Sequence, residues 1–121
     1  MNGPLDTFEL QILWEGVEHF TGLWDVEVLA RREHELSGVT PRDRARLALG
    51  RLAERGLIAI YTCRGIPTDE TCVQVGVEKL SNSLEANTSW EAPGEGQIGI
   101  WYDTTEEGFV AYREVTGWDS P

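Results

Sequence analysis

Arginines are the residues of this 121-residue chain that could do chemistry, and most lie in one segment. Residues 31–64 hold eight arginines against four acids, giving +4, whereas residues 1–30 carry −6 and residues 65–121 carry −9. Guanidinium groups bind phosphates and base edges, so this basic zone could meet DNA locally while the rest of a chain of net charge −11 repels non-specific DNA. Alternatively, the arginines are ordinary helix formers on a solvated surface.

The cysteines and histidines predict no metal site. Cys63 and Cys72 would face each other across a hairpin whose paired residue numbers sum to 135. Paired thiols are normally reduced in a cytosolic protein, so we expect plain strand packing in preference to a disulfide. Two cysteines without a second pair are a poor zinc signature, and neither His19 nor His34 belongs to an HExxH motif.

A glycine pattern resembling a nucleotide-binding motif has the wrong context. Gly94, Gly96 and Gly99 spell GxGxxG, but the dinucleotide fingerprint needs a strand before it and a helix after it, and here a β-prone run follows. No carboxylate pair stands beside a histidine, serine or cysteine nucleophile. We therefore expect no cofactor and no enzymatic activity.

A well-marked helix carries the central arginines. Thr40 suits the N-cap, Pro41 suits the first helical position, and Asp43 lies where a capping carboxylate helps. Gly56 follows the basic last turn and suits the left-handed cap conformation, and a β-prone run begins at Leu57. The sequence thus predicts a helix over 41–55 that runs into a strand.

At ~100° per residue this helix has two distinct faces. The expected inner face is apolar: Ala45, Ala48, Leu49 and Leu52. The expected outer face is charged, with one exposed leucine and one glycine: Asp43, Arg44, Leu47, Gly50, Arg51 and Glu54. Glycine costs ~1 kcal/mol against alanine inside a helix, so Gly50 points to a close approach by another molecule.

The remaining elements follow from periodicity and turn residues. Helices are expected over 5–20 and from Leu23 or Trp24 to about Glu35, and strands over 57–64, 71–77 and 98–103. Residues 78–97 form a polar, irregular insertion with one short helix near 78–84, and a capping box at Thr104 and Glu107 begins a last helix that ends near 116.

Apolar and aromatic side chains predict the core. The first helix is apolar on nearly all sides, with Leu10, Leu13, Trp14, Val17 and Phe20 in one stripe and Phe8 and Ile12 on another side, so we expect it to be largely covered. One face would pack on the core and the other on a partner subunit or on the C-terminal helix of the same chain. In the second helix the inward residues are Trp24, Val28 and Leu29. Trp14, Trp24 and Trp101 are expected in the core, whereas Trp90 and Trp118 are candidates for a protein interface or for local packing.

The run ALGRLAERGLI, with two helical segments before it and a strand pair after it, resembles the winged helix-turn-helix superfamily of bacterial regulators. The resemblance covers about 8–64 and 98–116. It implies an α+β fold in one domain, 1–121, with three N-terminal helices over 5–56, wing strands over 57–77 and a strand and C-terminal helix over 98–116. The insertion at 78–97 is longer than the simple wing of that family.

The resemblance implies a transcriptional regulator, expected to be a homodimer, whose helix 41–55 enters the major groove of double-stranded DNA. The implied DNA-binding residues are Arg31, Arg32, Thr40, Arg42, Arg44, Leu47, Arg51 and Arg64. Asp43 and Glu54 on the same face would repel phosphate. The alternative is therefore an acidic winged-helix interaction module, such as an accessory, phage-type or inhibitor protein, that binds a basic protein partner and not DNA. A third interpretation is a ligand sensor with a pocket lined by Trp24 and Trp101.

Hydropathy and the N-terminal segment bear on the compartment. No apolar run approaches 18 residues, so we expect no membrane span. The start, MNGPLDTFEL, lacks a basic region of the secretory type, and we expect a cytoplasmic protein.

Overall fold

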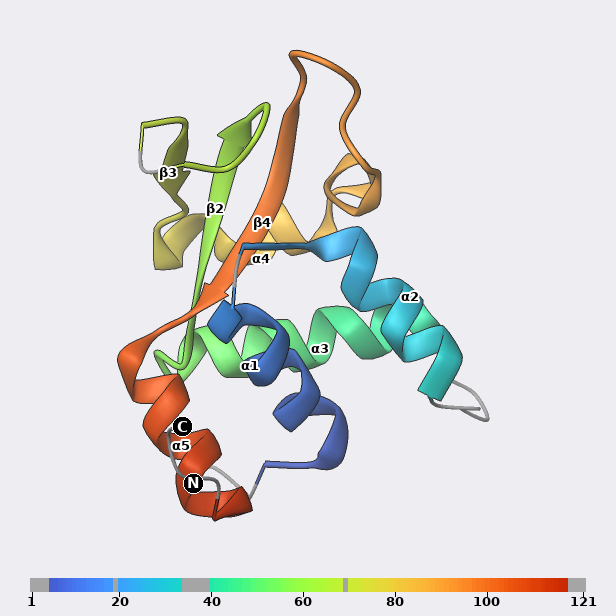
Figure 1. Cartoon of the computed structure of the whole chain (residues 1–121). Coiled ribbons are helices and arrows are strands. Elements are labelled where there is room, and N and C mark those ends of the chain that lie inside the picture. The colour runs from blue at the N-terminus through green and yellow to red at the C-terminus, as the bar shows by residue number, and fades with distance from the viewer. Residues whose placement is uncertain (1–4, 19, 34–39, 69, 118–121) are drawn as a thin grey trace.

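The computed structural model describes residues 5–18, 20–33, 40–68 and 70–117 and shows a mixed α+β fold (Figure 1). The described residues form five α-helices, one short 3₁₀ helix and a four-stranded antiparallel sheet. In chain order the elements are α1 (Thr7–Glu18), β1 (Thr21–Gly22), α2 (Leu23–Glu33), α3 (Pro41–Glu54), β2 (Ile58–Arg64), β3 (Cys72–Gln74), α4 (Val77–Glu85), η1 (Asn87–Trp90), β4 (Ile98–Thr104) and α5 (Glu106–Thr116). The predicted end of the second helix near Glu35, and Trp118, lie outside the described residues.

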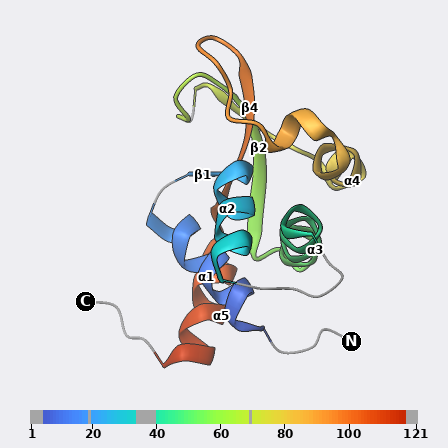
Figure 2. The ribbon, with the colours of Figure 1, turned by 90° about the vertical axis from the view of Figure 1, so that its right-hand side faces the viewer.

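The sheet pairs strands that are distant in the chain. Its order is β1-β4-β2-β3, and β2 pairs with β4 from Ile58↔Thr104 to Arg64↔Ile98. In the chain, the segment that contains β3, α4 and η1 therefore connects β2 to β4, which are neighbours in the sheet. Figure 2 shows α3 and α4 on the same side of β2 and β4.

One face of the sheet meets the helices. The strand residues of the hydrophobic core cluster are Ile58, Ile60, Ile100 and Tyr102, which the pairing places on one face. The Tyr102 hydroxyl donates a hydrogen bond to the Ile12 carbonyl at 2.7 Å and is fully buried. Burial raises the pKa of this phenol well above its ordinary value.

Helix α3 confirms the local signals. The Thr40 hydroxyl accepts a hydrogen bond from the Asp43 amide at 3.1 Å, Pro41 is the first helical residue, and Gly56 has a φ of 74°. The four residues of the expected inner face are buried: Ala45, Ala48, Leu49 and Leu52.

The cap of α5 differs from the prediction by one residue. Thr105, and not Thr104, is the N-cap, and its hydroxyl accepts from the Gly108 amide at 3.1 Å. Thr104 is the last residue of β4, and its hydroxyl instead donates to the Leu13 carbonyl at 2.6 Å. Two adjacent threonines offer the same capping group, so the choice depends on where the strand pairing ends.

Helix α1 is largely covered, as expected, whereas the core-facing side of α2 differs from the prediction. Phe8, Ile12 and Leu13 are fully buried, whereas Leu10, Trp14, Val17 and Phe20 are half-buried. In α2 the buried residues are Leu23, Val26 and Ala30, and Val28 is exposed. The second face of α1 meets α5 of the same chain, where Trp14 stacks on Tyr112, which matches one of the two alternatives for this helix.

The insertion contributes to the core. The predicted short helix is present as α4, and Leu80, Leu84 and Trp90 are buried in the main cluster. The Trp90 indole N–H donates to the Leu84 carbonyl at 2.8 Å, so this tryptophan packs locally and is not available as an interface residue. Trp14, Trp24 and Trp101, expected in the core, are only half-buried.

The two cysteines form a disulfide, so the expectation of unbridged thiols is wrong. The register Cys63↔Cys72 does match the predicted sum of 135, and this pairing places the two residues directly opposite each other. β3 spans only Cys72–Gln74, shorter than the predicted strand over 71–77. Among the described residues, no helix has the length and apolar character that crossing a bilayer requires.

Candidate interface around helix α3

Four of the predicted DNA-binding residues lie on α3: Arg42 near its N-terminal end, and Arg44, Leu47 and Arg51 along the expected outer face. Leu47 is 63% exposed, which matches its expected position on the outer face. The three arginines, however, fold back onto carboxylates of their own chain. These ion pairs decide what the surface can bind.

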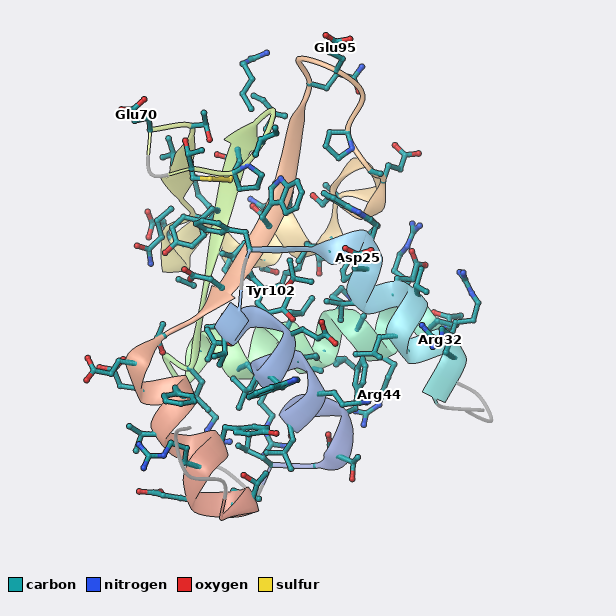
Figure 3. The ribbon with its side chains drawn as sticks, viewed as in Figure 1. Asp25, Arg32, Arg44, Glu70, Glu95 and Tyr102 are labelled. Atoms are coloured by element: carbon teal, nitrogen blue, oxygen red, sulfur yellow. A yellow bond between two sulfur atoms is a disulfide. The ribbon has the colours of Figure 1, made fainter. Side chains whose placement is uncertain are left out.

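Arg44 lies against the start of α1. Its guanidinium is 2.9 Å from the Asp6 carboxylate and 5.0 Å from the centre of the Phe8 ring, and its side chain is 25% exposed. Figure 3 shows Arg44 beside α1. Burial alone would raise the pKa of Asp6, but the hydrogen bond from the Glu9 amide and the positive charge of Arg44 outweigh it, so the pKa lies below its ordinary value.

Arg51 faces a buried carboxylate. Its Nε lies 3.3 Å from Oε2 of Glu9, whose side chain is 2% exposed. Glu9 also closes a reciprocal cap with Asp6: the Asp6 amide donates to Glu9 Oε1 at 3.0 Å, and the Glu9 amide donates to Asp6 Oδ1 at 2.8 Å. A buried charge without a partner is very unfavourable, so Arg51 has a structural role here.

Arg31, Arg42 and Arg46 also pair with carboxylates of their own chain. Arg42 lies 3.2 Å and Arg31 3.9 Å from the Glu27 carboxylate, and Arg46 lies 2.7 Å from that of Asp43. These pairs are more exposed than Arg51–Glu9 and individually contribute little stability.

Three of the eight predicted DNA-binding residues lie on other elements: Arg31 and Arg32 on α2 and Arg64 on β2. Arg64 is at the far end of β2, where its Nη1 donates to the Gly96 carbonyl at 2.6 Å. Arg32 is exposed on α2 beside a cavity of about 200 Å³ that Asp25 and Tyr102 also line (Figure 3). Thr40 serves as the helix cap.

A groove of about 580 Å³ separates α3 from α4. Its lining combines apolar and charged side chains from both helices: Arg46, Leu47, Gly50, Arg51, Glu54, Leu80, Ser81, Leu84 and Glu85. A Cβ at Gly50 would lie 3.5 Å from Leu84 Cδ1, so the glycine of the outer face is next to α4 of the same chain. Sequence reasoning missed this contact, although the spacing of Leu80 and Leu84 indicates a helix with an apolar side.

The other predicted or excluded sites can also be placed. Trp24 and Trp101, suggested as the walls of a ligand pocket, pack edge to face with ring centres 4.8 Å apart. Gly96, in the GxGxxG run, has a φ of 75° and precedes β4, as expected of a turn. Within the residues that the structure describes, no group of three or more His, Cys, Asp or Glu side chains could hold a metal ion.

Comparisons with known proteins add no further assignment. No family model matches the chain, and neither the curated proteins nor the solved structures gave a significant match. The function must therefore be argued from the geometry of the chain itself.

Proposed function

We propose that the chain is a winged-helix protein that binds a basic protein partner and does not read DNA through α3. The winged-helix assignment rests on the order of elements. Three helices, α1 to α3, precede the antiparallel pair β2 and β4, and the segment between these two strands would be an enlarged wing. Helices α2 and α3 would form the helix-turn-helix.

The observation that carries the proposal is the engagement of Arg44 and Arg51 by Asp6 and Glu9. For either guanidinium to reach a phosphate or a base edge, its ion pair would have to break. Release of Arg51 would leave the buried Glu9 carboxylate uncompensated, and because Arg51 itself is 40% exposed the cost is about 2–4 kcal/mol, less than for a fully buried pair. That cost would offset the ~1–3 kcal/mol that one arginine–base contact supplies.

Charge and shape support the same conclusion. The net charge of −11 attracts a basic partner over long range and repels a polyanion. Helix α4 also lies beside α3 along the groove described above, so a duplex that approached the outer face of α3 would meet α4.

DNA binding remains the second candidate because one observation favours it. Leu47 is 63% exposed on α3, and Arg31 and Arg32 are exposed near the end of α2. A complex in which these residues contact the duplex backbone would tolerate the internal ion pairs of Arg44 and Arg51.

The test compares two probes over the same salt series. Fluorescence anisotropy is measured with a labelled random duplex and with a labelled hexa-arginine peptide. We expect binding of the peptide at low salt and none of the duplex, and no retention of the protein on heparin. Duplex binding with a steep salt dependence, weakened in Arg31→Ala or Arg32→Ala, would instead establish the DNA-binding candidate.

A further inference from the structure

The sheet has a second face that does not belong to the main core. Side chains alternate along a strand, so the residues between the core positions of β2 and β4 point away from the core cluster. On this outer face the strand positions are Gly22, Ala59, Tyr61, Cys63, Cys72, Gln74, Gly99, Trp101 and Asp103.

Four aromatic residues form one continuous row on the outer face. Tyr61 and Trp101 are direct cross-strand partners. Phe20 meets Tyr61 edge to face with ring centres 5.4 Å apart, and Trp24 meets Trp101 in the same manner at 4.8 Å. All four residues are half-buried.

Two glycines let these rings lie against the backbone. A Cβ at Gly22 would overlap the indole of Trp24. A Cβ at Gly99 would lie 2.8 Å from Cγ of Pro93 and 3.1 Å from Nε1 of Trp101, so the proline and the indole both lie close to this glycine. A side chain at Gly22 would displace the indole of Trp24, and one at Gly99 would displace Pro93 and crowd Trp101.

The charges around the row favour a cation. None of the nine strand positions is Lys or Arg, whereas Asp103 is one of them and Asp25, beside Trp24 in the chain, is exposed. Glu95 and Glu70 stand at the outer end of the sheet (Figure 3). A stacking surface for single-stranded nucleic acid needs a basic groove, which these positions lack.

We propose that Phe20, Trp24, Tyr61 and Trp101 form the docking surface for an arginine-rich segment of a protein partner. The faces of aromatic rings attract guanidinium groups, which also stack on them, and the nearby carboxylates complement the same charge. This inference rests on the proposed function, because it gives the basic partner a location and a residue type.

The experiment measures the affinity of hexa-arginine and hexa-lysine for the oxidised protein and for three variants. Trp101→Leu and Trp24→Leu shorten the aromatic row. Trp14→Leu is the matched control, because Trp14 is also half-buried but stacks on Tyr112 of α5, with ring centres 5.6 Å apart. Backbone amide shifts of the wild-type protein locate the peptide independently of any variant, so a variant that fails to fold does not remove the test.

We expect hexa-arginine to bind at least about fivefold more tightly than hexa-lysine, since planar guanidinium groups stack better than ammonium groups. Trp101→Leu and Trp24→Leu should remove this preference, Trp14→Leu should retain it, and the shifted amides should cluster on β1, β2 and β4.

Four results would overturn the inference. Equal affinity for the two peptides, or amide shifts confined to α5 or to the groove between α3 and α4, would leave a basic partner but place it elsewhere. Binding of a single-stranded oligonucleotide that Trp101→Leu abolishes would replace the peptide with nucleic acid. Failure of both peptides to bind at low salt would remove the proposed function itself.

Discussion

Arg51 on α3 places its Nε 3.3 Å from a carboxylate oxygen of Glu9 on α1, and the two side chains differ greatly in exposure, 40% against 2%. The arginine can reach solvent if it is released, but the glutamate cannot. The pair therefore holds α1 and α3 together, and it also withdraws one guanidinium from the outer surface of α3.

Removal of Arg51 should destabilise the fold more than removal of a comparable exposed arginine. We expect Arg51→Ala to lower the free energy of unfolding by about 2–4 kcal/mol, since it strands a buried carboxylate. Arg46→Ala is the matched control, because its partner Asp43 is 47% exposed, and it should cost less than about 1 kcal/mol. Urea unfolding measures both variants, and equal losses would contradict a structural role for the pair.

A double variant separates charge from packing at the same place. Glu9→Gln combined with Arg51→Ala should recover part of the stability that Arg51→Ala loses, because no buried charge then remains unpaired. The double variant would be less stable than Arg51→Ala if Arg51 acted only by packing.

Gly50 should respond to substitution in the opposite direction from Gly108. A Cβ at Gly50 would make an ordinary contact with Leu84, so Gly50→Ala should stabilise the protein by about 0.5–1 kcal/mol through helix propensity. A Cβ at Gly108 would overlap the carbonyl of Leu57, so Gly108→Ala should destabilise it by about 1–3 kcal/mol. Thermal unfolding measures the stability of both variants. A loss of stability in Gly50→Ala would show that α4 packs too closely on α3 for an added methyl group.

The Asp6 carboxyl should contribute to acid sensitivity. Its pKa is lower in the folded protein than the ordinary value of 3.8, so its stabilising effect is present above that value and is lost as the pH falls through the lower, folded-state pKa. Asp6→Asn should therefore make the stability less dependent on pH below about 4. In NMR titrations of the Asp6 carboxyl carbon, the pKa of Asp6 should be higher in Arg44→Gln than in the wild-type protein. An equal pKa in the two proteins would exclude Arg44 as a cause.

Reduction of the disulfide between Cys63 and Cys72 should lower the stability by about 2–3 kcal/mol, since it releases a short closed loop in the unfolded chain. Unfolding with and without a reductant measures the loss. The double variant Cys63→Ser with Cys72→Ser should show no response to the reductant. An unchanged midpoint for the wild-type protein, with both thiols titrated as free, would contradict the prediction.

Local signals predicted α3 almost completely. Its cap at Thr40, its end at Gly56 and its buried side depend on residues within one or two turns, and all three were readable from the sequence. The N-terminus of α1 carried a similar signal in the spacing of Asp6 and Glu9, which matches a capping box and marks Glu9 as a residue with a structural partner.

Long-range pairing was not readable from the sequence. Arg44 and Asp6 are 38 residues apart, so the composition of the basic zone gave no indication that its charges are engaged. The aromatic row was missed for the same reason: Trp24 and Trp101 fit a core by residue type, and only the strand register puts Trp101 on the outer face. Sequence thus identified the elements, whereas the candidate sites depend on how distant elements meet.

Helix α4 belongs to the segment of the chain that connects the paired strands β2 and β4, and this has a consequence for folding kinetics. The ladder between β2 and β4 joins Arg64 to Ile98, so the strands cannot close like a tight hairpin when the protein folds. The ends of a long intervening stretch must first come together, which delays this ladder relative to the nearby contacts of α2 with α3. In a newly synthesised chain, the contacts between helices would therefore form first, while the edges of β2 and β4 are still unpaired.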